Sequence, residues 1–385
     1  MPSRWRERSL AEPSPFLIAA LSARALAASA RRAGQRVLAL DLFGDEDLTA
    51  AVLDHAIVPG DPFGGFDEVA LLAAAERLAP AGRGHRLVYG GGFEARAGLL
   101  GALGRGRAIC GNPPETLARL KDPPAFFGLL DRLGLPRPEF ALLPPPDPAG
   151  WLVKRIGGAG GSHIRPAGGV ESATGTYYQR RTAGRPVSAL IAGDGKCGRL
   201  LGFSEQWPSP DGAAQPFRFG GAAQPAIVPP AVVTAISAAL DPLVHASGLR
   251  GLASLDLLVG DDGFVVLEIN PRPGATLDIF DGAGDSSLFA LHVASCDGRL
   301  PERWHPPAAA RALQVVYADQ PLELTARQWP DWVADRPRPG TRIGRGGPIC
   351  TVLAEAPTAA AARQLLAERR SRILDALTCL DRHVA

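Results

Sequence analysis

The sequence predicts an α/β protein built in three parts, and three observations support this prediction. Apolar runs alternate with helix-like segments at the start of the chain, which indicates a small parallel sheet flanked by helices. Farther on, apolar runs follow one another across short turns, as in an antiparallel sheet. The last part has its own strand-like runs and a long Ala- and Arg-rich segment. We expect an N-terminal α/β domain over residues 1–111, a central domain over residues 112–300 and a small C-terminal appendage over residues 301–385.

The N-terminal part is expected to alternate strands over residues 15–21, 36–43 and 86–89 with helices over residues 22–32, 48–54 and 66–78. The Gly90-Gly91-Gly92 triplet follows the third strand. We interpret it as a strand-to-helix turn, although Gly residues there would also let a ligand approach the backbone closely. The triplet lacks GxGxxG spacing, so it does not predict a dinucleotide site.

Pro and Gly divide the rest of the chain. Pro residues open an expected helix over residues 113–120. The segment at residues 121–124, KDPP, is expected to break it before a second helix over residues 125–133, and a Pro-rich linker follows over residues 143–150. The remaining expectations are strands over 151–155, 176–181, 186–192 and 199–205, a loop over 217–221, helices over 231–247 and 286–295, strands over 313–317 and 349–354, and a helix over 358–377. The final part contains no acid pair, so we interpret it as structural.

Composition argues against several functional classes. A net charge of +2 favours neither nucleic acid nor an anionic membrane surface as a partner. No apolar run approaches the roughly 20 residues that span a bilayer, and we expect no signal peptide. Five scattered cysteines predict reduced thiols in a cytoplasmic protein, without a disulfide framework or zinc knuckle. Seven histidines without HxH or HExxH spacing argue against a His-built metal site.

The stretch from residue 251 to residue 277 carries the strongest prediction of a site. Two apolar runs, residues 253–259 and 264–269, flank an Asp261-Asp262-Gly263 turn, which is typical of a β-hairpin. With the turn centred on Asp262, the residues of one strand can be paired with those of the other by counting outward.

This pairing places Asp256 directly opposite Glu268, and Asn270 projects from the same face two residues on. Two carboxylates and an amide oxygen among apolar residues would repel one another without a cation. Such oxygen ligands suit Mg²⁺, which often binds together with substrate phosphates. The alternative is a surface hairpin whose two acids are merely solvated.

Lysine and asparagine are rare in this chain. The lysines are Lys121, Lys154 and Lys196, and the asparagines are Asn112 and Asn270. Nearly all other basic residues are Arg, whose planar fork cannot replace the compact charge of Lys, so each Lys becomes a candidate. Lys196 lies in an expected turn and is assigned no role.

A Gly-rich loop follows the strand that carries Lys154. Its sequence, residues 157–162, is GGAGGS, and Gly residues allow backbone N–H groups to crowd around phosphate oxygens. The loop lacks the GKS or GKT of a P-loop, and a mobile surface hairpin would have the same composition. Lys154 favours the anion site, because its ammonium and the amide donors would converge on one ligand.

These features together resemble the ATP-grasp superfamily, over about residues 112–300, with the first 110 residues similar to the α/β domain that usually precedes it. The matching positions, in chain order, are Lys121, Lys154 with its Gly-rich loop, the Gln179 strand, Asp256, and the string Glu268-Ile269-Asn270-Pro271-Arg272. The resemblance implies a two-part core with antiparallel sheets and a small nucleotide subdomain over about residues 122–185. It also implies an ADP-forming ligase that uses ATP and Mg²⁺, with Mn²⁺ as an alternative ion, to activate a carboxylate as an acylphosphate and join it to an amine.

The resemblance implies a role for each matching position. The metal ligands would be Asp256, Glu268 and Asn270. The loop closing over the γ-phosphate would comprise Gly157, Gly158, Gly160, Gly161 and Ser162. The remaining nucleotide contacts would be Lys121, Lys154, Gln179, Arg180 and Arg181, the last three on the hinge strand. Arg272 and Lys154 would act in catalysis. Separately from the resemblance, we expect scattered loops to build the substrate pocket, which would include Ser162, His163, Arg218, Gly220, Arg272 and Gly274.

Two departures from the family pattern concern the nucleotide. Family members usually carry an acid in the hinge where this chain has Arg180. They also tend to carry a ribose-binding acid where this chain has Arg185-Pro186-Val187. Backbone groups can still read adenine, whereas the ribose contact stays open.

A finer resemblance concerns the substrates. The segment YGGGFE at residues 89–94, the segment CGNPPETLARLKDP at residues 110–123 and the tail resemble ligases of methanofuran-type cofactor synthesis. It implies that the glutamate side-chain carboxylate is joined to tyramine or tyrosine. The alternatives are an ATP-grasp carboxylase or purine-pathway enzyme using bicarbonate or formate, and a non-catalytic nucleotide-binding protein. The expected partners are small molecules, not nucleic acid or membrane, and a homodimer is left open.

Overall fold

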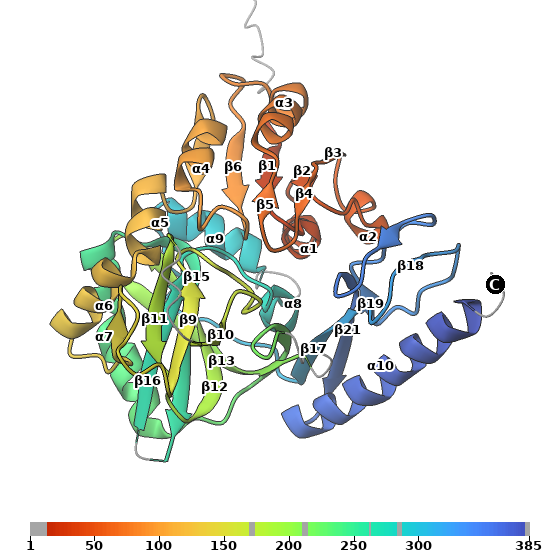
Figure 1. The fold of residues 1–385 in the computed structure, drawn as a ribbon. Coiled ribbons are helices and arrows are strands. Elements are labelled where there is room, and N and C mark those ends of the chain that lie inside the picture. The colour runs from red at the N-terminus through yellow and green to blue at the C-terminus, as the bar shows by residue number, and fades with distance from the viewer. Residues whose placement is uncertain (1–13, 169–173, 210–214, 262, 283–286, 382–385) are drawn as a thin grey trace, which may run out of the picture.

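The computed structural model describes residues 14–168, 174–209, 215–261, 263–282 and 287–381. Figure 1 shows the N-terminal sheet and its helices above, the central sheets below, and the C-terminal strands and helix on one side. In the described residues, no helix is long and apolar enough to cross a membrane. The N-terminal sheet is parallel and the central sheets are antiparallel, as the sequence predicts.

The N-terminal domain is a five-stranded parallel sheet in the order β3-β2-β1-β6-β7. Its strands are β1 (Phe16–Ala19), β2 (Val37–Asp41), β3 (Asp54–Ile57), β6 (Arg86–Tyr89) and β7 (Ala108–Cys110). Its helices are α1 (Arg24–Arg32), α2 (Glu46–Thr49), α3 (Glu68–Leu78) and α4 (Ala97–Gly104), and β4 (Gly60–Asp61) pairs with β5 (Gly65–Phe66) beside it.

The helix expected over residues 48–54 is wrong beyond residue 49. α2 ends at Thr49, and residue 54 already begins the edge strand β3. This strand is half exposed and so lacks the apolar run of a buried strand. The expectation also missed α4 and β7, which complete the sheet after β6.

The central part holds two antiparallel sheets. The smaller has the order β10-β9-β11-β8, and the larger has the order β16-β15-β12-β13-β14-β17-β21-β19. The smaller sheet comprises β8 (Phe140–Ala141), β9 (Trp151–Arg155), β10 (Arg165–Pro166) and β11 (Thr176–Arg180). Helices α5 (Pro114–Lys121) and α6 (Pro123–Arg132) precede it. The larger sheet begins with β12 (Arg185–Asp194), β13 (Gly198–Pro208), β14 (Phe219–Gln224), β15 (Arg250–Gly260) and β16 (Gly263–Asn270).

Three helices of the central part surround the larger sheet: α7 (Pro230–Ser247), α8 (Leu277–Phe280) and α9 (Leu288–Cys296). α7 ends at Gly248, whose φ of 68° is the left-handed conformation that closes many helices. Its buried residues pack on the sheet together with α6 in one continuous apolar core. The start expected for α9, residue 286, lies outside the described residues.

The predicted hairpin is confirmed. β15 and β16 pair antiparallel, and Asp256 lies opposite Glu268, with a register shift directly after Asp256. The expected turn centre, Asp262, lies outside the described residues. The acid pair therefore lies where the counting from sequence placed it.

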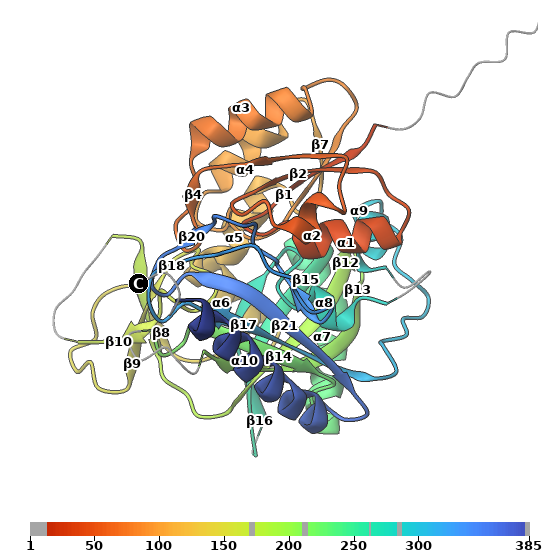
Figure 2. The same cartoon turned by 90° about the vertical axis from the view of Figure 1, so that its right-hand side faces the viewer.

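The C-terminal part differs from the separate appendage that the sequence analysis expected. β17 (Ala310–Tyr317), β21 (Pro348–Ala356) and β19 (Val333–Ala334) extend the larger sheet, while β18 (Leu322–Glu323) and β20 (Arg342–Ile343) form a small ribbon. The helix α10 (Ala359–Asp381) lies across β17 and β21 (Figure 2). The link is β14, which pairs with β17 and falls partly within the loop expected over residues 217–221, so that expectation is wrong. Its sequence, FGGAAQ, lacks the apolar signal of a strand.

Candidate active site

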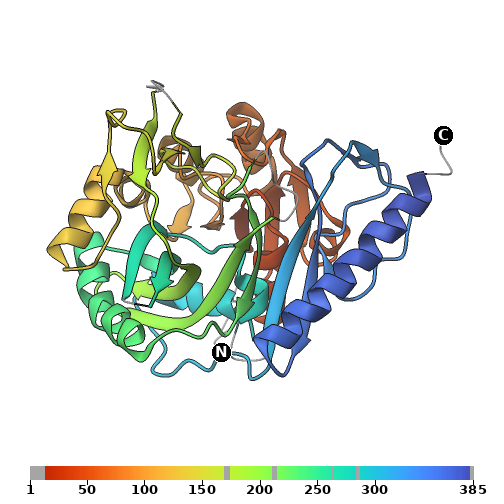
Figure 3. The same ribbon diagram turned by 60° about the horizontal axis from the view of Figure 1, so that its bottom comes forward.

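A cavity of about 1210 Å³ opens between the three parts of the chain. Figure 3 shows its surroundings, with the smaller sheet on one side, the C-terminal strands on the other and the N-terminal domain behind. Eleven of the residues predicted from sequence line it: Lys154, Gly160, Gly161, Gln179, Arg180, Arg181, Asp256, Glu268, Asn270, Arg272 and Gly274. Six do not: Lys121, Gly157, Gly158, Ser162, Arg218 and Gly220.

The acid pair on the hairpin is held by hydrogen bonds. Ser188 Oγ donates to Asp256 Oδ1 at 2.6 Å, and Asn270 Nδ2 donates to Asp256 Oδ2 at 3.0 Å. Burial, reinforced by the charge of Glu268, raises the pKa of Asp256 to about 6. The two carboxylates thus repel each other, as expected of a pair that a cation would stabilise.

Lys121 approaches this pair from beneath the cavity. Its Nζ donates to Glu268 Oε2 at 3.3 Å, to the Ile269 carbonyl at 3.2 Å and to Asn270 Oδ1 at 3.1 Å. Burial would raise the pKa of Glu268, but the charges of Lys121 and Lys154 outweigh it and lower that pKa to about 2. Lys121 therefore keeps Glu268 ionised and does not itself face the cavity.

The orientation of Asn270 bears on metal binding. Its amide nitrogen faces Asp256, and its Oδ1 faces Lys121. Ligation through Oδ1 requires this amide to rotate, since only the oxygen can bind a cation. Asp256 and Glu268 fit a Mg²⁺ ion, because both offer carboxylate oxygens and their repulsion would be relieved by it.

The nucleotide lysine and the hinge strand meet in the cavity wall. Lys154 on β9 donates through Nζ to Gln179 Oε1 on β11 at 2.9 Å, and both side chains are buried. Lys154 uses one of its three donors in this bond. Gln179 Nε2 has no hydrogen-bond partner among the described residues, although such a buried donor costs about 1–3 kcal/mol. These unused donors point to a ligand with acceptor atoms.

The hinge arginines line the cavity next to this pair. Arg180 lies over the Trp151 ring at 5.5 Å and donates through a side-chain nitrogen to the Ala149 carbonyl at 3.1 Å. The N–H of Arg181 donates to the Gly150 carbonyl at 2.8 Å. The Arg180 side chain is thereby engaged with the small sheet, in the position where the family pattern has an acid.

The Gly-rich loop is anchored at two points. A Cβ on Gly157 would lie 2.5 Å from the Ala95 Cα, so this end packs closely against the N-terminal domain. A Cβ on Gly161 would lie 1.8 Å from the Phe217 carbonyl oxygen, and its φ is +73°. The two halves of the loop therefore differ. Gly160 and Gly161 line the cavity, whereas Gly157 and Gly158 pack closely against Ala95 and His163.

Arg272 is held by a residue to which the sequence analysis gave no role. Its Nε donates to Glu94 Oε1 at 2.7 Å, and Glu94 Oε2 accepts the N–H groups of Gly92 and Phe93 at 2.8 and 3.0 Å. Glu94 ends the YGGGFE segment, so the Gly triplet places it. Gly90 and Gly91 line the cavity, so the turn also lets a ligand approach closely.

The structure places two predicted substrate residues behind the cavity wall. The Arg218 guanidinium lies 3.7 Å from the Tyr317 ring and donates to the Gly346 carbonyl at 3.1 Å. A Cβ on Gly220 would lie 2.5 Å from the backbone of Pro208, so this Gly allows close packing of β13 and β14. The sequence predicts a loop at both positions, whereas the strand β14 begins at Phe219.

The sequence analysis missed an acidic group at the other end of the cavity. Arg24 on α1 donates through two nitrogens to the Asp278 carboxylate, at 2.5 and 2.6 Å, and through Nε to Asp335 Oδ1 at 3.0 Å. Asp45 also lines the cavity there. These residues come from all three parts of the chain, so no local pattern connects them.

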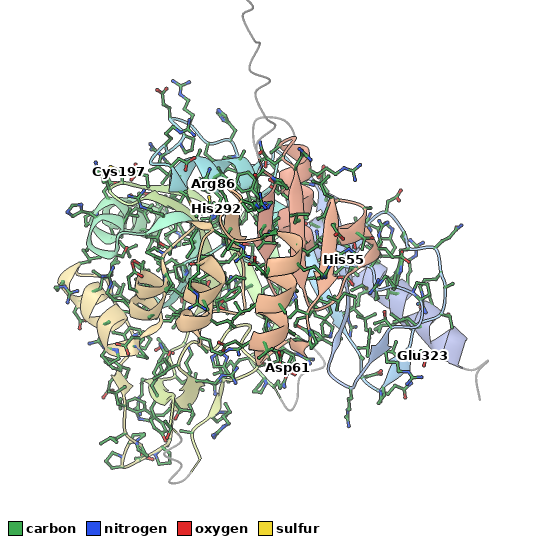
Figure 4. The ribbon with its side chains drawn as sticks, turned by 90° about the horizontal axis from the view of Figure 1, so that it is seen from above. His55, Asp61, Arg86, Cys197, His292 and Glu323 are labelled. Carbon is green, nitrogen blue, oxygen red and sulfur yellow. The ribbon has the colours of Figure 1, made fainter. Side chains whose placement is uncertain are left out.

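A second group brings together two cysteines and a histidine. Ligand atoms of Cys110, His292 and Cys296 lie within 4.8 Å of one another, and Figure 4 shows His292 beside Arg86. The Leu252 N–H donates to His292 Nδ1 at 2.9 Å, and His292 Nε2 lies 2.9 Å from the Cys110 carbonyl. Both ring nitrogens are engaged with the backbone, which leaves His292 no free lone pair for a metal.

Comparison with known proteins agrees with this architecture. Residues 127–276 match the ATP-grasp domain family. The biotin carboxylase domain of the Hydrogenobacter thermophilus 2-oxoglutarate carboxylase, solved as a dimer with MgADP, ADP and bicarbonate, is similar at 12% identity and a TM-score of 0.67, over 90% of this chain and 87% of that one. N5-carboxyaminoimidazole ribonucleotide synthetase from Thermus thermophilus is similar at 17% identity and a TM-score of 0.63, over 91% and 97%.

A third similar structure is the biotin carboxylase of Campylobacter jejuni in a β,γ-ATP complex, at 13% identity and a TM-score of 0.65, over 91% of this chain and 89% of that one. No curated protein sequence matches the chain. The chain has the ATP-grasp fold, with a parallel N-terminal sheet and antiparallel sheets in the core. At these identities the likeness concerns the fold, and the activity has to be argued from the site.

Proposed function

We propose that the chain is an ADP-forming ligase that uses ATP and Mg²⁺ to activate a carboxylate as an acylphosphate and join it to an amine. The observation that carries this proposal is that Asp256, Glu268, Lys154 and Arg272 all line one cavity. Phosphoryl transfer to a carboxylate brings two anions together, so positive charge must neutralise their approach. The residues of this cavity can supply and hold that charge.

The contacts of the cavity residues support a separate role for each side chain. Bound Mg²⁺ would supply positive charge at the phosphate oxygens, and Asp256 and Glu268 would hold it. Among the described residues, Lys154 Nζ donates to Gln179 alone, so two of its donors are available to the phosphates, and the unpaired Gln179 Nε2 is available to the nucleotide. Arg272 is fixed by Glu94, so its guanidinium can stabilise the developing negative charge without first being ordered.

For the substrates, we propose glutamate, through its side-chain carboxylate, and tyramine or tyrosine as the amine. The support is the resemblance of residues 89–94 and 110–123 to ligases of that subgroup. Both segments reach the site: Glu94 holds Arg272, and Asn112 Nδ2 donates to the Pro271 carbonyl at 2.8 Å. The segments that carry the resemblance thus position the end of the hairpin.

The second candidate is a carboxylase or purine-pathway enzyme that uses bicarbonate or formate. The similar structures support it, since one was solved with bicarbonate and another is an N5-carboxyaminoimidazole ribonucleotide synthetase. A non-catalytic nucleotide-binding protein is the third candidate. The retained acid pair argues against it, because repelling buried carboxylates are maintained only at a cost.

A phosphate-release assay separates the three candidates. The chain is incubated with ATP and Mg²⁺ plus glutamate and tyramine, plus glutamate and tyrosine, or plus bicarbonate or formate with an amine. A ligase releases phosphate only when the acid and the amine are both present. Release with bicarbonate or formate in place of glutamate supports the second candidate, and nucleotide binding without release in any arm supports the third.

A further inference from the structure

The acidic end of the cavity is not used by the proposed phosphate chemistry. It lies at the carboxyl edge of the N-terminal parallel sheet, where residues following β1 and β6 line the cavity. Chain order reverses between these two strands, because β2 and β3 lie on one side of β1 and β6 and β7 on the other. Such a crevice is the usual ligand position in open parallel sheets.

Carboxylates outnumber cations at this end. Arg24 is 6% exposed, and its guanidinium pairs with Asp278 and Asp335. Asp47 lies 3.7 Å from Arg24 and accepts the backbone N–H groups of Asp335 and Arg336. Those contacts account for three carboxylates and for Arg24.

Two further carboxylates have oxygens without a hydrogen-bond donor. Asp45 is 4% exposed, lines the cavity and accepts no hydrogen bond on its carboxylate from the described residues. Asp41 lies fully buried behind the cavity wall; its Oδ1 accepts the Gly44 N–H at 2.9 Å, whereas its Oδ2 has no partner among the described residues. A buried acceptor without a donor is unfavourable, which indicates that this end is shaped to receive a donor.

Electrostatics supports the same conclusion. Burial, reinforced by the charges of Asp335, Asp41 and Asp47, raises the pKa of Asp45 to about 9, and Arg24 opposes this only in part. Arg342 and Arg345 also line the cavity, but both are exposed, and Arg342 pairs with Glu323 at 2.8 Å. An added positive charge would therefore be stabilised at Asp45.

A metal ion is a poorer match than an organic cation. A metal requires ligand oxygens that converge on one point. In the described residues, the carboxylates of this end do not form a group of three whose oxygens lie within 4.8 Å of one another. An ammonium group, with three diverging donors, suits separated carboxylates.

We propose that the acidic end of the cavity, at Asp45 beside Asp278 and Asp335, binds the ammonium group of the amine substrate. This inference rests on the proposed ligase function for its choice of an amine. It places the carboxylate substrate beside Arg272 at the phosphate end and the ammonium group at the acidic end of the same cavity. The ammonium ion takes the place of the proton that Asp45 otherwise holds. After passing a proton to the Asp45 carboxylate, the neutral amine moves to the acylphosphate and attacks its carbonyl carbon, and phosphate leaves as the amide bond forms.

Matched ligands and matched variants test this proposal. Calorimetric binding is measured for tyramine and for its alcohol counterpart, 4-(2-hydroxyethyl)phenol, and likewise for 1,4-diaminobutane and 1,4-butanediol. Asp45→Asn removes the unpartnered carboxylate, and Asp54→Asn removes an exposed acid of the same domain that does not line the cavity. We expect at least one amine to bind more tightly than its alcohol, and Asp45→Asn to weaken that binding at least about tenfold.

Asp54→Asn should leave amine binding unchanged. Equal binding of both amines and their alcohols, or unchanged amine affinity in Asp45→Asn, overturns the proposal. So does displacement of the amine by Mg²⁺ through a site that needs Asp45.

MgATP binding measured on the same samples distinguishes failure of the amine site from failure of the proposed ligase function. If MgATP binds and no amine does, the amine site is overturned and the ligase function stands. Amine binding without substrate-dependent phosphate release leaves the acidic site and removes the ligase.

Discussion

At the hairpin end, the carboxylates of Asp256 and Glu268 lie within the field of Lys121, Lys154 and Arg272, whereas at the N-terminal end four carboxylates lie around Arg24, those of Asp45, Asp47, Asp278 and Asp335. Glu268 has a lowered pKa at the first end, and Asp45 has a raised pKa at the second. The same functional group, a side-chain carboxyl, is thus kept ionised at one end and binds its proton tightly at the other. The surrounding cations, and not the carboxylates alone, therefore decide which ligand each end accepts.

The largest effect is expected from Glu268→Gln at the hairpin end. Gln keeps the shape but removes the charge that Lys121 and a bound cation share, so kcat/KM for ATP should fall at least about 100-fold. Steady-state phosphate release measures the loss. Glu355→Gln, an exposed acid that pairs with Arg311 at 2.8 Å, serves as the control and should keep normal activity. An equal loss in both variants would contradict the role of Glu268.

A smaller effect is expected from Lys154→Ala in the same region. Loss of the buried ammonium removes a charge-assisted donor, so KM for ATP should rise at least about tenfold. Lys196→Ala is the matched control, because Lys196 lies exposed in the turn between β12 and β13. Nucleotide titration on both variants checks the prediction. Unchanged ATP affinity in Lys154→Ala removes this residue from the site.

The raised pKa of Asp45 at the acidic end should make the free energy of unfolding depend on pH. The pKa of Asp45 is about 9 in the fold, against about 3.9 in an unfolded chain, so the folded state binds this proton more tightly. Stability from this group is present at low pH and is lost as pH rises from about 4 to about 9.

Asn cannot titrate, so Asp45→Asn should become progressively more stable than the natural chain across that range. Thermal unfolding at several pH values measures the difference, with Asp54→Asn as the charge-matched control. We expect the melting temperatures to differ by a few degrees at the alkaline end. A difference that does not grow with pH would show that Asp45 is not held in its protonated form.

The smallest effect is expected in the Gly-rich loop, where two neighbouring glycines make a matched pair. Gly160 has a φ of +68° and open space at its Cβ position, so Gly160→Ala should cost about 1 kcal/mol of strain. Gly161→Ala adds a collision with the Phe217 carbonyl and should cost more. Urea unfolding and KM for ATP measure both effects. Equal behaviour of the two variants would mean that contact with Phe217 does not anchor the loop.

The hairpin end was predictable because it is local. Asp256 and Glu268 are separated by a short turn, and period-two alternation alone places them opposite each other. Lys154 was predictable from composition, because it is one of three lysines in the chain and precedes the Gly-rich loop. What sequence could not show is that Lys121 would lie beneath the acid pair and turn the Asn270 amide toward Asp256, since this depends on packing of α5 against β16.

The acidic end was not predictable because its members are distant in sequence. Asp45 follows β2, Asp278 belongs to α8 and Asp335 follows β19. They meet because the C-terminal strands extend the larger sheet through β14. This extension could not be predicted, since the sequence of β14 is only weakly apolar. The weak apolar signal of β14 also explains why the prediction of a loop over residues 217–221 is wrong. That prediction placed Arg218 and Gly220 in the substrate pocket.

Calorimetric titration with a non-hydrolysable ATP analogue, with Mg²⁺ and with a chelator, tests the metal–nucleotide role of the hairpin most directly. The natural chain is compared with the double variant Glu268→Ala, Asn270→Ala. We predict that the natural chain binds the analogue at least about tenfold more tightly with Mg²⁺ than without it, and that the double variant loses this dependence. Equal Mg²⁺-dependent affinity in the two chains would contradict the central claim that the β15–β16 hairpin is the metal end of an ATP site.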